Sequence, residues 1–545
     1  MISGFNVGLV AGVLELLLRV CGLPWRLRLW LLALGVGGYC LLTGMQPPVV
    51  RATLMAWVVI GACALDRVIS WPNTLAAAAL LILWIHPVQL FDPGFQLSFG
   101  AVVSLLVFTG RWQPWLKARL WRIQPAWLRR YIALSLSTTS AIWVGLSPVL
   151  AWYFHLVSPV SMLANLLLAP LLSALITVGT TCLMTATMLE AVMRWSSGLL
   201  GWLLQATLGC VSWCHAIPGG YWFVGHPNPW FLIGYYLLVG VSVFQVRLRW
   251  RPARLLLGWA AALTVWLWSF VAQHAAASSW LRLDILDVGH GDSIVIRAPR
   301  GHTLVVDAGS SEAGRFRVIP FLRFEGISVL EAVVVTHPDA DHLGGVIPLL
   351  REVRVKRLLT NGTQDDTMSS RQLRDLAARR HVPETALASG GRLDVGPDVE
   401  ITVLHPPRGL VQGSAPASND NSLVLKVTLG AVSVLLCGDI EEAGLPWLLN
   451  AGYALGSTVL QVPHHGSRLG EAGAAFFHAV QPQVAILSVG RTHHLPAPET
   501  LEALRRKAAR IYSTREDGAI HLRTDGERLE VRTFKHSTGE TNFGF

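Results

Sequence analysis

Acidic residues are almost missing from the first half of this 545-residue chain. Residues 1–278 contain 16 Lys or Arg but only four carboxylates, at Glu15, Asp66, Asp92 and Glu190. Residues 279–545 contain 28 basic and 30 acidic residues, so the whole positive excess of the chain lies in the first half. Soluble domains carry charges of both signs over their surfaces, and this composition argues against a soluble first half.

Cysteine is also scarce, because only Cys437 of the seven cysteines lies after residue 278. This excludes a disulfide within the second half, even in a compartment that would permit one. The opening apolar segment lacks the basic leader and the small-residue cleavage site of a signal peptide. We therefore expect the membrane spans themselves to target the chain.

Long apolar stretches fill the first half, each about as long as the roughly 20 residues that cross a bilayer. Twenty of the 22 Trp residues lie in the same half, many near the ends of these stretches, where an indole suits the membrane interface. The sequence therefore predicts a membrane domain over residues 1–278 with about ten helices. The stretches are 5–18, 29–45, 52–66, 74–91, 95–109, 131–154, 160–189, 198–217, 229–246 and 255–273.

The basic residues between these stretches predict the orientation. With ten spans, 15 of the 16 basic residues of this half fall on one side and only Arg51 falls on the other. Basic residues are retained on the cytoplasmic side, so residues 279–545 are expected outside the cytoplasm. The basic segment 247–254 could also bind nucleic acid, but its place between two spans favours topology.

The second half has the pattern of an α/β domain. Short β-type runs alternate with helical patterns, which predicts a sandwich of sheets with helices outside. The small and polar stretch 272–279 marks the boundary, so the domain is expected over residues 279–545. Strands are predicted at 281–288, 293–298, 303–306, 331–336, 422–428, 432–436, 459–462 and 484–488, and helices at 343–351, 369–380, 470–479 and 498–508.

The densest group of ligand-type residues follows the apolar run 333–335. His337, Asp339, Asp341 and His342 lie within six residues and precede a Gly-Gly pair. Two imidazoles and two carboxylates on one tight loop favour divalent cations over an ordinary solvated loop.

Other predicted strands also end in ligand-type residues. Asp439 follows the run 432–436, the His464-His465 pair follows 459–462, and His494 follows the run 485–489. Each signal alone is weak, but loops at one edge of a sheet are where ligands from distant parts of a sequence converge.

These motifs resemble a known family. Segments 287–293, 336–342, 419–423, 438–439 and 464–467 are similar to the metallo-β-lactamase-like domain of the ComEC family, the inner-membrane DNA channel of natural competence. Segments 2–7, 42–52, 94–99 and 158–170 resemble the competence region of that family.

The resemblance implies a polytopic α-helical membrane domain followed by an α/β metallo-β-lactamase-like αββα sandwich. Family members begin with earlier membrane segments and an OB-like domain, and we expect that N-terminal part to be missing here. Asp339 occupies the second His position of the fold's general ligand motif, as the resemblance to this family leads us to expect. His290 stands where Gln is expected, and Asn6 stands where His is expected.

The resemblance also implies two divalent metal ions, Mn²⁺ or Zn²⁺, since a carboxylate-rich set is harder than the sites that Zn²⁺ favours. We expect His337 and Asp339 at one ion, Asp341 and His342 at the other, and Asp439 as a bridge. Either His464 or His465 is expected as a further ligand, with Asp420 closing the first site. Asp341, His342 and Asp439 are the expected catalytic residues. Residues expected to support the ligands from behind are Asp292, Asn421, Ser467 and His494.

The leading functional hypothesis is a channel for single-stranded transforming DNA with an outward-facing nuclease that hydrolyses the other strand. One alternative is a membrane-anchored hydrolase of a lipid or cell-wall phosphodiester, although ten spans are excessive for an anchor. Another is a DNA transporter whose second domain binds DNA without cutting it.

The first hypothesis implies DNA and membrane lipid as partners, together with a competence DNA receptor, cytoplasmic translocation proteins and further copies of the chain. It places the protein in the inner membrane as a multi-pass protein with a periplasmic C-terminal domain.

Overall fold

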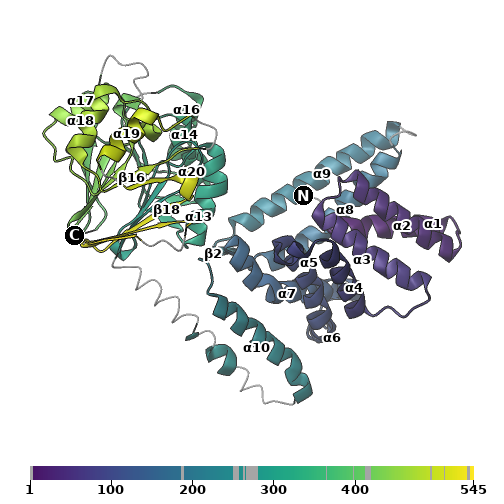
Figure 1. Cartoon of the computed structure of the whole chain (residues 1–545). Helices are drawn as coiled ribbons and strands as arrows, with labels where there is room; N and C mark the ends of the chain where they lie inside the picture. Colours follow the sequence, from purple (N-terminus) through teal and green to yellow (C-terminus); the bar gives the residue numbers. More distant parts are fainter. Residues whose placement is uncertain are drawn as a thin grey trace. The chain divides into compact units, whose positions relative to one another are not determined.

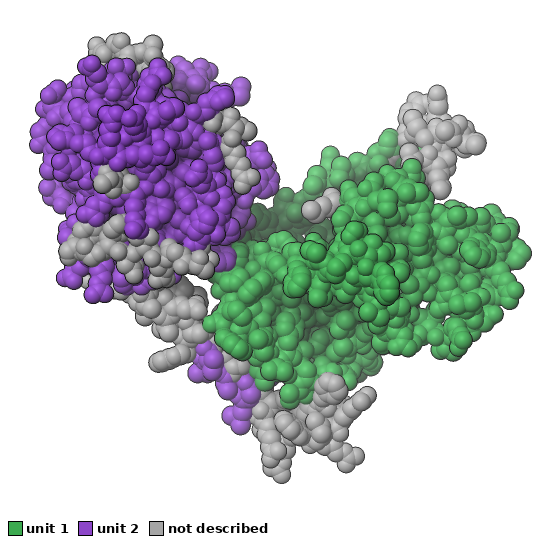
Figure 2. Space-filling view, in the orientation of Figure 1, with its two compact units in different colours: residues 1–255 green, residues 256–545 purple. Residues whose placement is uncertain are grey.

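The computed structural model describes residues 4–185, 190–248, 257–261, 264–265, 280–363, 365–396, 398–411, 419–490, 494–507, 510–536 and 541–544. The chain divides into two compact units, residues 1–255 and 256–545, which Figure 2 shows in different colours.

The first unit is built from helices (Figure 1). Nine of the ten apolar stretches overlap a helix, and most of the tenth, 255–273, lies outside the described residues. A short antiparallel pair, β1 (Leu156–Val157) and β2 (Trp222–Phe223), joins two of the connections. The helices are α1 (Gly4–Val20), α2 (Trp25–Leu42), α3 (Pro47–Ala64), α4 (Trp71–Ile85), α5 (Pro93–Ser104), α6 (Gly110–Arg119), α7 (Ala126–Phe154), α8 (Ser161–Thr185), α9 (Glu190–Ala216) and α10 (Pro229–Leu248).

Among the described residues, five helices are long and apolar enough to cross a membrane, including the continuous helical segment Pro93–Arg119. Two shorter apolar helices are Trp71–Ile85 and Pro229–Val243. Large apolar side chains lie on the surface of this unit, and Trp84 is 90% exposed. Because such surfaces are stable against lipid, the predicted helical membrane region is confirmed, while the number of spans stays a prediction.

The second unit contains two large sheets. The first has the order β10-β9-β7-β5-β4-β3-β18-β19-β20 and the second the order β11-β12-β13-β14-β15-β16-β17. The strands of the first sheet are β3 (Leu281–Ile285), β4 (Ile294–Arg297), β5 (Thr303–Val306), β7 (Ala332–Val335), β9 (Leu358–Thr360), β10 (Glu384–Ala386), β18 (Ile520–Thr524), β19 (Arg528–Thr533) and β20 (Thr541–Gly544). Those of the second are β11 (Arg392–Asp394), β12 (Glu400–His405), β13 (Val424–Leu429), β14 (Val432–Leu436), β15 (Val459–Gln461), β16 (Val484–Leu487) and β17 (Arg510–Ser513).

Three apolar cores hold this unit together. The largest contains side chains of both sheets, such as Leu283 and Val434, and lies between them. A second core joins the first sheet to its helices, and a third joins the second sheet to helices that carry Phe476 and Leu504. The predicted αββα sandwich is therefore confirmed. The helices are α12 (Ser311–Ala313), α13 (Ile319–Phe324), α14 (Ala340–Leu343), α15 (Val346–Glu352), α16 (Met368–Arg379), α17 (Gly444–Asn450), α18 (Gly470–Val480), α19 (Pro498–Arg506) and α20 (Thr514–Asp517).

Strand pairing decides where the loops of this unit meet. β5 is parallel to β7, and β14, β15 and β16 are parallel neighbours in the other sheet. The carboxyl ends of parallel neighbours lie at the same edge of a sheet. The residues that follow β5, β7, β14 and β15 are therefore placed to form one site.

Candidate metal centre

The loop that follows β7 and carries the metal-ligand residues is hydrogen-bonded to the end of β5. The Thr336 backbone N donates to Asp307 Oδ1 at 2.8 Å, and the Thr336 hydroxyl donates to Asp307 Oδ2 at 2.6 Å. Asp307 directly follows β5, so the ends of two neighbouring strands share one carboxylate. His337 and His342, in the same loop, are fully buried.

The single helical turn α14 separates the residues of this loop. Asp339 precedes the turn at its N-cap position, and Asp341 and His342 lie within it. Adjacent side chains on an α-helix point about 100° apart. Asp341 and His342 therefore face different neighbours, although they follow one another in the sequence.

The first group of ligand-type atoms consists of His337, His342 and Asp439. His342 Nε2 lies 3.3 Å from Asp439 Oδ2, and His337 Nε2 lies 4.0 Å from the same oxygen. Asp339, expected beside His337, has its Oδ2 3.8 Å from His337 Nε2 and is partly exposed. His342 thus joins His337, whereas we expected it to share an ion with Asp341.

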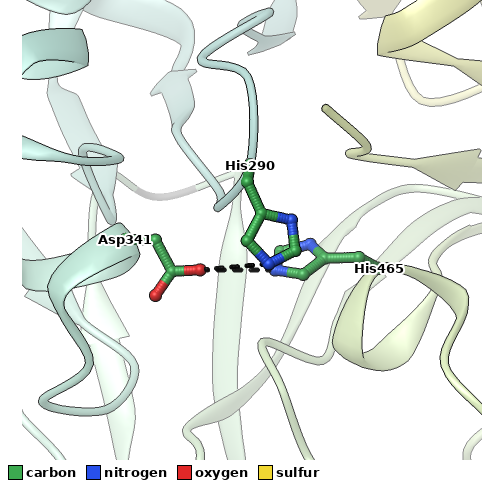
Figure 3. Close-up of side chains that lie close together, drawn as sticks. All are labelled: His290, Asp341 and His465. Atoms are coloured by element: carbon green, nitrogen blue, oxygen red, sulfur yellow. Dashed lines mark ion pairs between the residues drawn. The ribbon is translucent and has the colours of Figure 1, made fainter. Parts of the chain in front are cut away.

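The second group consists of His290, Asp341 and His465, which Figure 3 shows with their side chains converging. Asp341 Oδ2 lies 3.6 Å from His290 Nε2 and 3.9 Å from His465 Nε2. His465 is fully buried, whereas His290 and Asp341 are partly exposed.

Asp439 connects the two groups. Its Oδ2 lies 3.4 Å from His465 Nε2 and 3.7 Å from His464 Nε2, in addition to its contacts with His337 and His342. One buried carboxylate oxygen therefore faces four imidazoles. A bridging ligand between two cations needs such a position.

The charges of these groups stabilise one another. Burial alone would raise the pKa of Asp439, but the imidazoles of His342 and His465 hold it well below its ordinary value. Burial alone would lower the pKa of His342, but Asp439 and Asp307 raise it well above 6.5. Burial, reinforced by His342, lowers the pKa of His337 well below 6.5. Asp439 is thus ionised and His337 neutral, the forms that bind metal.

The buried donor atoms fit divalent cations. Nε2 of His337, His342 and His465 and Oδ1 of Asp439 are buried and have no hydrogen-bond partner within the described ranges. Polar atoms buried in this way are costly unless something binds them. In each of the two groups, the ligand atoms lie within 4.8 Å of one another. The centre therefore has the donor types and the spacing that divalent metal ions need.

Other side chains fix the orientation of the imidazoles. His342 Nδ1 lies 2.8 Å from Asp307 Oδ2, which leaves Nε2 directed at Asp439. Asp292, expected to support the ligands, lies with Oδ1 4.0 Å from His465 Nδ1 and accepts a hydrogen bond from Gln461 Nε2 at 2.7 Å. Carboxylates behind ligating imidazoles orient the ring and raise its basicity.

His464 is held at the edge of the centre by a separate carboxylate. Its Nδ1 lies 2.5 Å from Glu441 Oε1, and Asn419 Nδ2 donates to the same oxygen at 3.1 Å. Burial lowers the pKa of His464, but the Glu441 contact raises it above 6.5 overall. Of the two histidines proposed as a further ligand, His465 belongs to the candidate groups and His464 borders them.

Four other expected residues do not belong to either group. Asp420 Oδ1 accepts hydrogen bonds from the backbone N of Ala443 and Gly444, at the start of α17. Asn421 exchanges two hydrogen bonds with the backbone of Val411.

The other two lie in loops that follow strands. The Ser467 carbonyl accepts from the Thr500 hydroxyl, and His494 is exposed. Residues 491–493, just before His494, lie outside the described residues.

Four residues of the centre were not expected as site residues: His290, Asp307, Glu441 and Gln461. Asp307 had a detectable signal, because it follows the apolar run 303–306 as Asp439 follows 432–436. His290 lies within a motif that carried the family resemblance. Glu441 contacts His464, and Gln461 donates to Asp292. These contacts join residues that are distant in the sequence, so no local sequence pattern predicts them.

Comparisons with known proteins give two family matches and several relatives. Residues 1–251 match the family described as "Competence protein", and residues 286–491 match the metallo-beta-lactamase superfamily. The ComE operon protein 3 of Bacillus subtilis is 28% identical over 96% of this chain and 67% of its own length. Competence protein ComA of Neisseria gonorrhoeae is 26% identical over 96% of this chain and 70% of its own length. The expected loss of an N-terminal part is not supported by these matches.

Among solved structures, Zn²⁺-bound PqqB from Methylobacterium extorquens is 13% identical, with a TM-score of 0.29 over 41% of this chain and 85% of that chain. The two sequence families match the two units separately. The chain therefore joins a region that matches the competence-protein family, residues 1–251, to a domain that matches the metallo-beta-lactamase superfamily, residues 286–491.

Proposed function

We propose that this chain is a membrane channel for the uptake of single-stranded transforming DNA, with a metal-dependent nuclease as its second unit. The nuclease would hydrolyse phosphodiesters of the strand that is not transported. The observation that carries this proposal is the convergence of four imidazoles on Asp439, in a domain joined to a competence-family region. The names of the relatives in Bacillus and Neisseria support the link to competence.

His337, His342 and Asp439 would hold one divalent ion, and Asp341, His465 and Asp439 would hold the second. Two such ions, Mn²⁺ or Zn²⁺, supply an activated water and stabilise charge on the attacking and leaving oxygens of a phosphodiester. The residues of the chain fix the ligands, since Asp307 orients His342 from behind. The backbone N of Asp439 donates to the Ser422 hydroxyl at 3.2 Å, which anchors the bridging residue.

Substrate would reach the centre past its exposed side chains. The side chains of Asp339, Asp341 and His464 are 43%, 30% and 25% exposed, whereas those of His337, His342 and His465 are fully buried. A phosphodiester would therefore approach past the exposed side chains, while the buried imidazoles stay shielded from water.

The nuclease is proposed to act outside the cytoplasm. Fifteen of the 16 basic residues of the first half fall on one side of the predicted membrane, which supports this orientation. The exception is Arg51, which lies near Asp92. Arg51 is buried on α3, and its Nη1 lies 3.6 Å from Asp92 Oδ1. Arg51 is one of 16 basic residues in this half, and the other 15 still favour the proposed orientation.

Reporter fusions test the orientation. A reporter that is active only outside the cytoplasm should be active when fused after Ser279 and silent when fused within residues 117–122. The reverse pattern would contradict degradation before entry.

A cleavage assay tests the enzymatic part. The purified full-length chain, freed of metal with a chelator, should cleave end-labelled duplex DNA only after Mn²⁺ or Zn²⁺ is restored. The Asp439→Asn variant should not cleave the DNA under either condition. Binding of DNA without cleavage would instead support a transporter with a non-hydrolytic domain. Cleavage of a lipid phosphodiester in place of DNA would support the membrane-anchored hydrolase.

A further inference from the structure

We propose that His290 is a ligand of the second metal ion, which it would hold together with Asp341 and His465. This inference rests on the proposed metal centre and adds a nitrogen ligand to it. The second position would then have two imidazoles and Asp341, with Asp439 shared between the ions. Its coordination would be richer in nitrogen than Asp341 and His465 alone provide.

The distances suit one ion. Ligand atoms about 2.0–2.1 Å from a tetrahedral Zn²⁺ lie about 3.4 Å apart. Asp341 Oδ2 lies 3.6 Å from His290 Nε2, and His465 Nε2 lies 3.4 Å from Asp439 Oδ2. The His290 and His465 rings lie with centroids 4.6 Å apart and planes inclined by 55°. Figure 3 shows both imidazoles directed at the same side of Asp341.

The backbone around His290 is built to hold this position. Gly291 has φ +104°, and a Cβ there would lie 2.0 Å from the Asp341 carbonyl oxygen. A Cβ on Gly490 would lie 2.9 Å from the His290 backbone N. The loop of His290 therefore packs against the Asp341 turn on one side and Gly490 on the other, and only glycine permits both approaches.

A simple ion pair between His290 and Asp341, without a metal ion, would also explain why these two side chains lie close together. The same unit contains such a pair at His302, whose Nδ1 lies 3.7 Å from Glu331 Oε2. His290 differs because His465 Nε2, buried and without a hydrogen-bond partner in the described part of the chain, lies 3.9 Å from the same Asp341 oxygen. His302 is therefore a matched control for His290.

The added imidazole also predicts a metal preference. Imidazole favours Zn²⁺ and Co²⁺ over Mn²⁺, whereas carboxylates suit Mn²⁺. His290 should therefore shift the second position towards Zn²⁺. Replacing His290 by Gln removes the nitrogen ligand and keeps a neutral side chain of similar reach, so the preference should move back towards Mn²⁺.

Metal binding to the full-length chain in detergent tests this role without measuring activity. Metal-free wild type, His290→Gln, His302→Gln and Asp439→Asn are titrated with Zn²⁺, Mn²⁺ and Co²⁺ against a chelator. We expect two ions in wild type and in His302→Gln. His290→Gln should bind its second ion at least about 100-fold more weakly, the upper end of the cost of losing an outer partner, and should change the Co²⁺ visible spectrum.

A variant that gains a signal distinguishes loss of a metal ligand from misfolding of the chain. His290→Cys should keep the second ion and add the charge-transfer absorption of a cobalt–thiolate bond, which a merely structural residue would not produce.

His290→Gln that matches His302→Gln in both affinity and spectrum would overturn the role of His290, while two ions in wild type would leave the proposed metal centre standing. Wild type that binds no ion would overturn both.

Discussion

Large apolar side chains face outward in the helical unit and inward in the sheet-rich unit. Trp84, Leu42 and Trp230 are each at least 77% exposed, whereas the strands of the second unit enclose their apolar side chains in three cores. The second unit instead exposes charges, and it gathers buried imidazoles and carboxylates at the metal centre. The surrounding solvent, lipid or water, therefore decides which residues each unit turns outward.

The largest effect is expected from a substitution that changes only the buried metal centre. Asp439→Asn keeps the shape of the side chain but removes the charge that faces four imidazoles. We expect hydrolysis to fall at least about 10³-fold and both ions to be lost, since loss of a bridging carboxylate leaves the cations poorly neutralised. Cleavage rates and metal content of the purified chain measure this.

Asp394→Asn on β11 is the matched control, because it makes the same substitution at an exposed carboxylate of the same unit. It should keep the metal content, the cleavage rate and the membrane insertion of wild type. Retention of wild-type metal content in Asp439→Asn would contradict the assignment of Asp439.

A Leu→Ala substitution in each unit tests whether large apolar side chains face inward in the second unit and outward in the first. Leu448 on α17 is fully buried, and Leu80 on α4 is 69% exposed. Leu448→Ala should destabilise its unit by about 2–5 kcal/mol because it leaves a cavity. Leu80→Ala should cost only about 0.5 kcal/mol, as an exposed site does.

Hydrogen exchange of peptides from each unit, in the full-length chain in detergent, measures both costs. Equal losses in the two variants would show that Leu80 packs against protein rather than lipid.

Acid should weaken the sheet-rich unit through His405. Burial lowers the pKa of His405 from 6.5 to about 4, so the folded unit keeps this imidazole neutral. The unfolded chain takes up a proton below about pH 6.5, so the stabilisation is full above that pH and is lost as the pH falls towards 4. The loss attributable to His405 is about 3 kcal/mol.

The pH dependence of hydrogen exchange in β12, which ends at His405, measures this effect. His405→Leu should flatten the profile between pH 4 and about 6.5. His302→Leu, at an exposed position of the same unit, is the control and should keep the wild-type loss of protection in β12. An unchanged profile in His405→Leu would contradict the buried neutral state.

The smallest expected loss of function follows substitution of Asp307, whose carboxylate contacts the far ring nitrogen of His342. Asp307→Asn should keep the hydrogen bond that Oδ1 accepts from the Thr336 backbone N, but it should weaken the orientation of His342. Metal affinity should fall about 10–100-fold, because outer partners of ligating histidines have effects of this size. Chelator competition measures the affinity, and an unchanged value would show that His342 is oriented by other contacts.

The sequence was most informative where the chemistry is local. The loop 336–345 revealed a metal site because four ligand-type residues lie within six positions after an apolar strand. The strand-end positions of Asp439 and His465 were also readable, because parallel neighbours end at one sheet edge.

The distribution of ligands between the two groups could not be predicted. It depends on the single turn α14, which points Asp341 and His342 in different directions. The contribution of His290 depends on the approach of its loop to Asp341, which lies far along the sequence. The pairing of β18 with β3, which aligns Ile520 with Ile285, is likewise invisible to local patterns.

Channel and nuclease are proposed to be separable functions of the two units. Transformation with single-stranded and with duplex DNA, in cells that carry His337→Ala combined with Asp339→Ala, tests this separation. We expect the variant to insert and to take up DNA supplied as single strands, but to be deficient with duplex DNA. Equal, wild-type uptake of both forms would contradict the proposal that the second unit degrades the other strand.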